Sequence, residues 1–295
     1  MPRKRAVAAL LRFATGAAVT LLIAGFFGAA LIRLGPGYET DERTLDARYS
    51  DATTGAIGRE NAKDSNVLTF YGRYLTQAVR GNFGISRTYE IPVSELIRSR
   101  AGVTLRLIGE GLGLGWILGL SLAGAATFFR WRLLTLSAEA FSALALSLPA
   151  AVFALLLFLA RGPVFLVLAM AVFPRVFRYA HDLFEQARRE PRIEAARARG
   201  VREWNIFRDY VVKPSWPPLL ALAGVSFSIA FGALIPVEVV CDIPGIGQLA
   251  WKAALGRDLP VLVTLTLMVA AITVAVNGLA GWLGDPRDER EGLAQ

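Results

Sequence analysis

The sequence is poor in the residues from which most catalytic and metal sites are built. Its 295 residues include one cysteine, Cys241, and one histidine, His181. A single cysteine excludes an intrachain disulfide, and one histidine with one distant cysteine makes no metal-ligand cluster. The chain also lacks a Gly-x-x-x-x-Gly-Lys-Ser/Thr phosphate loop, a His-Glu-x-x-His motif and a Gly-x-Ser-x-Gly motif. We therefore predict no catalytic, cofactor-binding or metal-binding residue, and we expect any ATP to be hydrolysed by another subunit.

Charge is also scarce, and long apolar runs take its place. Charged residues make up 19% of the chain, against about 25% in ordinary soluble domains. Hydrophobic residues make up 54%, and the mean hydropathy is +0.46. A helix needs about 20 apolar residues to cross the hydrocarbon core of a bilayer. Six runs are candidates: residues 13–32, 111–129, 140–160, 162–174, 214–237 and 259–284. The sequence thus predicts an all-α polytopic membrane bundle with six spans.

Two of these runs need a further argument. The run 13–32 follows a basic start, but it is longer than the apolar region of a secretory signal peptide and no clear cleavage site follows it. We therefore predict a retained signal anchor. The run 162–174 is short, and it becomes a span if it extends to Tyr179 while Arg175 and Arg178 snorkel to the membrane interface.

Lysine and arginine concentrate in the short cytoplasmic loops of membrane proteins, and this rule orients the six spans. With both termini in the cytoplasm, the basic N-terminal tail, Arg130, Arg132 and the segment 178–213 all lie on that side; this segment has nine basic and six acidic residues. The predicted regions are 1–34 (tail and first helix), 35–101 (extracytoplasmic loop), 102–284 (five-helix core with the cytoplasmic loop 178–213) and 285–295 (cytoplasmic tail). The net charge of +8 then follows from topology, and no basic groove with stacking aromatics indicates nucleic-acid binding.

Small residues recur at four-residue spacing in two of the runs. Such a stripe lies along one helix face and lets two membrane helices approach closely. We expect helix packing at Gly111, Gly115, Gly119, Gly224, Ser228 and Gly232. Asn277 in the last run is expected to hydrogen-bond across helices, and Pro149 and Pro236 are expected to kink or end their helices.

Two acidic residues, Glu110 and Glu139, lie near the ends of runs. Buried in lipid, either carboxylate would indicate an ion or proton pathway, as in a secondary transporter driven by an ion gradient. At the membrane interface, either one would only mark the end of a span. We favour the second interpretation and keep the secondary transporter as the alternative function.

The segment 178–213 is long for a simple connection, and its pattern predicts two short helices. The first follows Pro191 and ends at Gly200, which is suited to a left-handed cap. The second carries Trp204, Phe207 and Val211 on one face. Such amphipathic helices need a cover, which is supplied by the protein's own helix ends, by the lipid surface or by a partner subunit.

Within this segment, Glu194-Ala195-Ala196 followed by Gly200 resembles the EAA motif of the membrane subunits of ATP-binding-cassette (ABC) importers. Its place before the penultimate run is where that family carries the motif. Three further stretches resemble the dipeptide, oligopeptide and nickel branch of these permeases. They are residues 74–96, with 80–86 as the core; residues 244–261, with 244–249 and 257–261; and the ending, with Asn277 and residues 285–287.

This resemblance implies a type I importer permease in a bacterial or archaeal cytoplasmic membrane. It implies that the helix from Glu194 to Gly200 couples to a cytoplasmic ATPase, that small Ala195 and Ala196 allow close approach, and that Gly200 permits the turn. The implied partners are ABC ATPase subunits that bind ATP and magnesium, a second permease subunit, an extracytoplasmic solute-binding protein and membrane lipid. Three features depart from the family pattern, namely the very short connection at Arg161–Gly162, the prolines at 214, 217 and 218, and residues 35–38, which resemble the family's proline/glycine/aspartate element only loosely. The transported solute, and whether the second permease is a copy of this chain, stay open, as does a membrane scaffold that transports nothing.

Overall fold

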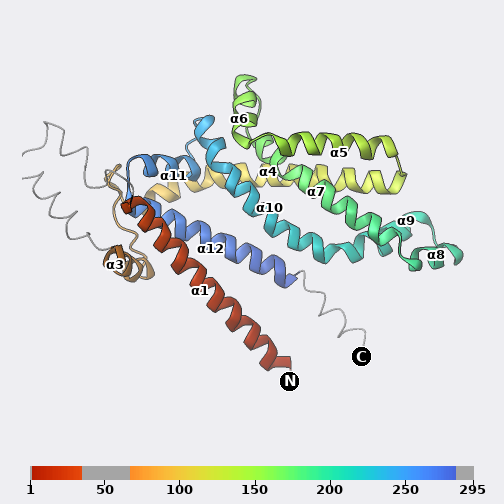
Figure 1. Cartoon of the computed structure of the whole chain (residues 1–295), viewed down its shortest axis with the longest axis horizontal. Coiled ribbons are helices and arrows are strands. Elements are labelled where there is room, and N and C mark those ends of the chain that lie inside the picture. The colour runs from red at the N-terminus through yellow and green to blue at the C-terminus, as the bar shows by residue number, and fades with distance from the viewer. Residues whose placement is uncertain (1, 35–66, 284–295) are drawn as a thin grey trace, which may run out of the picture. The chain divides into compact units, whose positions relative to one another are not determined.

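The structure is a computed structural model, and it describes residues 2–34 and 67–283. Every regular element in these ranges is a helix, which confirms the predicted all-α class (Figure 1). The helices are α1 (Pro2–Leu34), α3 (Val67–Val79), α4 (Val93–Phe129), α5 (Arg132–Ser147), α6 (Ala150–Leu159), α7 (Phe165–Arg188), α8 (Pro191–Ala198), α9 (Glu203–Ile206), the π-helix η2 (Phe207–Val212), α10 (Lys213–Val240), α11 (Ile246–Leu255) and α12 (Leu259–Leu283). The predicted tail 285–295 and residues 35–66 of the predicted loop lie outside the described residues.

The apolar runs fall on helices, but not all of these helices are equally suited to lipid. Among the described residues, three helices are long and apolar enough to span a membrane, namely Val93–Phe129, Glu203–Val240 and Leu259–Trp282, and the bent pair Arg132–Ser147 and Ala150–Leu159 makes a fourth if it is taken as one span. In α1, the described apolar part is the shorter stretch Phe13–Gly28. Large apolar side chains also face outward: Leu105 and Ile117 are each 65% exposed and Leu133 is 83% exposed. Exposed leucine and isoleucine on helices of this length are what a lipid-facing surface requires.

The third run, 140–160, is divided between two helices. Helix α5 ends at Ser147, α6 begins at Ala150, and the two are bent by 97° at this break. The cause is Pro149, because a proline pushes the preceding residue out of the helical region. Leu148 is extended, with φ −95° and ψ 131°. Pro149 thus ends its helix as predicted, whereas α10 continues past Pro236 to Val240.

The fourth run lies in α7, and α7 is not among the helices apolar enough to span a membrane by composition. It packs instead against α10, α5 and α6, and Figure 1 shows α7 running beside α5 and α10. Its side chains Val167, Val172 and Val176 are fully buried. Because neighbouring helices cover this helix, it does not need an uninterrupted apolar surface, and Arg175 and Arg178 occupy its exposed side.

The described chain divides into two compact units. The first consists of Met1–Ala101 and Leu249–Ile272, and the second of Gly102–Gln248 and Thr273–Gln295. In the first unit, the Tyr74 hydroxyl lies 2.6 Å from the Thr264 hydroxyl, and the Ser86 hydroxyl donates to Asp258 at 2.5 Å. The Ser86–Asp258 bond joins two of the stretches quoted above, 74–96 and 244–261, across 172 positions of the sequence, and the Tyr74–Thr264 bond lies just beyond the second stretch.

The described part of the predicted loop 35–101 is largely helical. It contains α3, and α4 begins at Val93, well before the apolar run at 111. Residues 80–92 connect them, with an isolated antiparallel bridge between Ile85 and Pro92, and Gly81 and Gly84 adopt positive φ angles of 80° and 78° there. The polar start of α4 was read as loop because apolar runs detect only the membrane-embedded part of a helix.

Candidate functional site

The segment 178–213, which we call the interspan segment, folds onto the rest of the second unit. It contains the last turns of α7, then α8, α9 and η2. Helix α8 begins with Pro191 at its first position, where a missing N–H costs nothing. It ends in a Schellman motif: the Gly200 N–H donates to the Arg197 carbonyl at 2.9 Å and the Val201 N–H to the Ala196 carbonyl at 3.2 Å. Gly200 has φ +76°, so it caps α8 in the left-handed region as its sequence position suggested.

The EAA-like residues divide between two faces of α8. Ile193 and Ala196 are buried, with 1% and 0% exposure, against the protein itself. Glu194 and Ala195 are exposed on the opposite side. A partner can therefore touch Glu194 and Ala195 directly, whereas Ala196 is small because the underlying core leaves no room for more.

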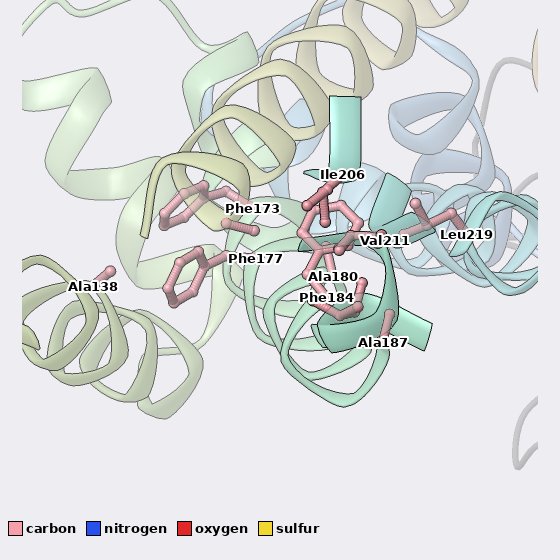
Figure 2. Packing of buried hydrophobic residues seen from close by; sticks show 12 residues of the cluster. Ala138, Phe173, Phe177, Ala180, Phe184, Ala187, Ile206, Val211 and Leu219 are labelled. Atoms are coloured by element: carbon pink, nitrogen blue, oxygen red, sulfur yellow. The ribbon is translucent and has the colours of Figure 1, made fainter. Parts of the chain in front are cut away.

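An apolar core beneath α8 fixes its position. The buried members include Phe177, Ala180, Phe184, Ile193, Ala196, Ile206 and Val211. Figure 2 shows Ala180 and Phe184 of α7 facing Ile206 and Val211 from the α9–η2 stretch. Burial of this apolar surface holds α8, whose 8 residues would not form a stable helix alone, because an isolated helix of fewer than about 12 residues is marginal in water. The predicted second short helix is instead the start of the continuous helical stretch from Glu203 to Val240.

The aromatic residues predicted on the second short helix are only partly covered. Val211 is buried, Phe207 is half-buried, and Trp204 is 54% exposed. The ring of Phe128, at the end of α4, lies edge-on to Trp204 and to Phe207, at centroid distances of 5.8 and 5.4 Å. The end of α4, which is one of the three covers considered from the sequence, covers part of these rings and leaves Trp204 54% exposed.

Ion pairs connect the elements of the interspan segment. Arg197 in α8 donates to both carboxylate oxygens of Glu203 in α9, at 2.6 and 3.1 Å. This hydrogen bond, together with the positive charge of Arg197, lowers the pKa of the Glu203 carboxyl below its ordinary value. Arg188 donates to the Thr127 carbonyl at the end of α4. Burial lowers the pKa of the Arg188 guanidinium, and the nearby Glu185 carboxylate opposes that shift.

The interspan segment continues into the membrane helix that follows without a break. One helical stretch runs from Glu203 to Val240, with η2 as a wider turn inside it. The Ser215 hydroxyl donates back to the Val211 carbonyl at 2.7 Å, just before the prolines at 217 and 218. π-type turns of this kind occur often at functional positions.

The small residues of α4 face α7. A Cβ atom at Gly119 would lie 2.7 Å from Val176 Cγ1, and one at Gly115 would lie 3.2 Å from the Ala169 carbonyl oxygen. A Cβ at Gly111 would lie 3.2 Å from the Phe165 carbonyl oxygen. Glycine at these positions lets the two backbones come together.

The small residues of α10 differ from one another. A Cβ at Gly224 would lie 2.7 Å from Asn277 Oδ1 in α12, and the Asn277 amide donates to Ser228 at 3.1 Å. A Cβ at Gly232 would meet no atom within 4 Å. Asn277 therefore does hydrogen-bond across helices, and close packing on α10 involves Gly224 and Ser228 but not Gly232.

Neither of the two carboxylates considered for an ion pathway is buried, since Glu110 is half-buried and Glu139 is exposed. Glu110 accepts a hydrogen bond from Arg106 at 2.7 Å, one turn earlier in α4, and Glu139 is exposed on α5. Within residues 2–34 and 67–283, no three His, Cys, Asp or Glu side chains gather as metal ligands. These positions fit charged residues near span ends better than a buried relay.

The sequence did not predict that one carboxylate, that of Glu238, would be buried. Glu238 in α10 is fully buried, and it follows directly after the apolar run 214–237. The available signal was an acidic residue at the end of an apolar run, followed at once by Pro244-Gly245-Ile246-Gly247. Only the folded chain shows that this loop returns to cover the carboxylate.

The sequence of this chain matches a known protein family. A family model for the inner membrane component of binding-protein-dependent transport systems matches residues 111–287, which is more than half of the chain. The chain belongs to this family. It is a membrane permease of the ABC importer type, as the EAA-like motif and the three accompanying stretches implied.

Relatives match over nearly their full length. A protein of Brucella suis biovar 1 that is named as a peptide permease is 28% identical, covering 92% of this chain and 93% of its own. The glutathione transport system permease of Salmonella paratyphi A is 26% identical, covering 88% and 90%. A nickel import system permease of Staphylococcus aureus is 24% identical, covering 90% and 86%. The names agree on the permease role and differ on the solute.

Proposed function

We propose that this permease forms half of the translocation pore of an ATP-driven importer for peptides or a related small solute. A second permease subunit supplies the other half, and an extracytoplasmic binding protein delivers the solute. ATP and magnesium are bound by separate ATPase subunits. The family match over residues 111–287, with α8 in its middle, is the observation that carries this proposal.

The solute class rests on the names of the relatives. These name peptide, glutathione and nickel transport. Two of the three are peptides, counting glutathione as a tripeptide, so peptide is the class to test first.

The orientation of the chain follows from its charges. Basic residues concentrate in the N-terminal tail, in the interspan segment and in the turn at Arg130 and Arg132, so these regions lie in the cytoplasm, and six spans place the C-terminus on the same side as the N-terminus. The exposed apolar side chains of α4 and α5 then face lipid or the second permease.

Helix α8 is the part that docks on the ATPase. Its buried face is anchored by Ile193 and Ala196, its end is fixed by Gly200, and its free face carries Glu194 and Ala195. A charged group next to a small side chain on a rigid, exposed helix allows close contact with a groove and a directional hydrogen bond in it. ATP-driven closure of two ATPase subunits moves α8 and switches the pore between its two open states.

The test is reconstitution of the full chain in proteoliposomes with the second permease and the ATPase subunits, with the solute-binding protein added on the opposite side of the membrane. The wild-type complex is expected to take up peptide only when ATP is present on the side of the membrane to which the ATPase subunits are bound. Glu194→Arg is expected to abolish copurification of the ATPase and uptake, since it reverses the charge at the docking face. Asp182→Arg, the same reversal at an exposed position of α7, is the matched control and keeps both activities.

Two results would overturn this assignment. If Glu194→Arg keeps ATPase association and uptake, α8 is not the coupling helix. If uptake proceeds without any ATPase and is abolished by a protonophore, the chain is a secondary transporter.

A further inference from the structure

The buried carboxylate of Glu238 lies at the centre of a hydrogen-bonded cluster. Its Oε1 accepts from the Thr104 hydroxyl of α4 at 2.7 Å, and its Oε2 accepts from the Gln248 backbone N–H of α11 at 3.0 Å. The Thr104 hydroxyl oxygen in turn accepts from the Ile246 N–H at 2.8 Å. We call these four groups the Glu238 clasp. It joins three helices, α4, α10 and α11, through directional bonds.

The loop between α10 and α11 is shaped around this carboxylate. A Cβ atom at Gly245 would collide with both carboxylate oxygens of Glu238. A Cβ at Gly247 would lie 2.9 Å from Ile235 Cα and 3.1 Å from Glu238 Oε2. The Ile243 N–H also donates to the Glu238 carbonyl at 2.8 Å. Both glycines are thus needed for close approach, and residues 241–248 have little freedom to move independently of Glu238.

Because Glu238 is buried, its carboxylate oxygens need hydrogen-bond donors from the protein. A carboxylate removed from water is costly unless donors satisfy its oxygens, and an incompletely satisfied polar cluster is worse than an apolar one. The bonds therefore hold the loop in one position relative to α10. A contact with this directionality is stiff, whereas apolar packing alone is not directional.

The clasp and the interspan segment are the two ends of one helix. The helical stretch from Glu203 to Val240 carries η2 near its start and Glu238 near its end. At 1.5 Å per residue its 38 residues span about 57 Å. A displacement imposed on the first turns of this helix is carried to its last turn, and the clasp passes it to residues 241–248.

We propose that Glu238 is a positioning residue that transmits movement of α8 to the loop 241–248 at the opposite end of α10. This inference rests on the proposed function, because the movement originates in ATPase docking. With the clasp intact, the loop 241–248 moves together with α10. When the clasp is broken, the loop no longer moves with α10.

The test uses hydrogen–deuterium exchange on the full chain in complex with its second permease and ATPase subunits, with and without magnesium ATP. In the wild type, ATP is expected to change exchange at least threefold both in peptides from 190–213 and in peptides from 241–248. Glu238→Met keeps a similar side-chain volume but removes both acceptors. It is expected to keep the response of 190–213 and to lose that of 241–248.

Two further variants separate this role from simple loss of fold. Thr104→Val removes the hydroxyl that bridges α4 to the clasp, and is expected to reduce the same response with α8 unaffected. Glu238→Gln can accept from the Gln248 N–H and donate to the Thr104 hydroxyl, so it is expected to retain the response. In reconstituted vesicles, Glu238→Met is expected to lower the amount of solute moved per ATP about tenfold while basal ATP hydrolysis stays within twofold of the wild type.

The outcomes distinguish the two proposals. If ATP leaves residues 190–213 unchanged in the wild type, the proposed function fails, and this inference fails with it. If 190–213 respond but 241–248 do not, or if 241–248 respond equally in Glu238→Met, the transmission role is wrong and the proposed function stands. If uptake and ATP hydrolysis fall in parallel in Glu238→Met, the residue is only structural.

Discussion

The two ends of the helical stretch from Glu203 to Val240 are held by opposite kinds of interaction. At its beginning, an apolar core of Phe184, Ile206 and Val211 holds the interspan segment. At its end, the hydrogen bonds to Glu238 hold the loop 241–248. Apolar packing is strong but tolerates small shifts, whereas hydrogen bonds to a buried carboxylate demand fixed geometry. Apolar packing therefore lets the interspan segment adjust to a partner, whereas the hydrogen bonds to Glu238 hold the loop 241–248 rigidly at the other end of the helical stretch.

The largest effect is expected at the rigid end. Gly245→Ala places a Cβ against both carboxylate oxygens of Glu238. Because neither the loop nor the carboxylate can move away, we expect the free energy of unfolding to fall by about 3 kcal/mol. Gly232→Ala is the matched control, since its Cβ meets no atom within 4 Å, and it is expected to be neutral or stabilising by up to about 1 kcal/mol. Thermal unfolding in detergent measures both, and equal melting temperatures would contradict the close packing around Glu238.

The apolar end is tested by two adjacent alanines. Ala196→Leu adds bulk to a fully buried position and is expected to cost about 2 kcal/mol. Ala195→Leu adds the same bulk to an exposed position and is expected to change the free energy of unfolding by less than about 0.5 kcal/mol. The same Ala195 variant is expected to reduce ATPase copurification strongly. A stable Ala196 variant would show that the core beneath α8 has room to spare.

A smaller effect is expected at the cap of α8. Gly200→Ala must adopt φ +76°, which costs about 1 kcal/mol for a residue with a Cβ, although no atom lies within 4 Å of that Cβ. Gly200→Asn is expected to cost less, because asparagine tolerates the left-handed region. Gly113→Ala in α4, also free of neighbours but helical, is the control for added bulk. Equal unfolding curves for Gly200→Ala and Gly113→Ala would contradict a role for the left-handed cap.

The smallest effect concerns the ion pair between Arg197 and Glu203, whose side chains are 38% and 60% exposed. Glu203→Gln is expected to cost less than about 1 kcal/mol, because water screens an exposed pair. The folded-state pKa of Glu203 lies below its ordinary value, so this stabilisation is complete above about pH 4.3 and disappears as the pH falls through the folded pKa. Unfolding curves of both proteins are expected to differ at pH 7 and to converge at low pH. A constant difference across this range would show that the pair is not its source.

Much of the architecture could be read from the sequence because lipid imposes a simple rule on composition. The runs 111–129, 214–237 and 259–284 lie in α4, α10 and α12 as predicted. The run 140–160 lies in α5 and α6 and is bent by 97° at Pro149, the residue that was expected to kink or end its helix. The length of the run did not give the size of this bend, because run length depends on apolar composition and not on helix direction.

The candidate site was predicted in part for a similar reason. Pro191 and Gly200 mark the limits of α8 through local backbone preferences that act within a few residues. The sequence does not show which face of α8 is exposed, because Ala195 and Ala196 are the same type of residue and differ only in what packs against them. That difference arises from Ile206 and Phe184, which lie elsewhere in the chain.

The sequence by itself determined the helical class, the position of the membrane helices, the end of α8 and the membership of the importer permeases. Each of these depends on composition or on neighbours along the chain. Only the tertiary structure decided that α7 is covered by other helices, that Glu194 and Ala195 face outward, and that Glu238 is enclosed by residues 104 and 245–248. These features depend on contacts between residues distant in the sequence, and a buried carboxylate in particular is tolerable only where the fold brings donors to both of its oxygens.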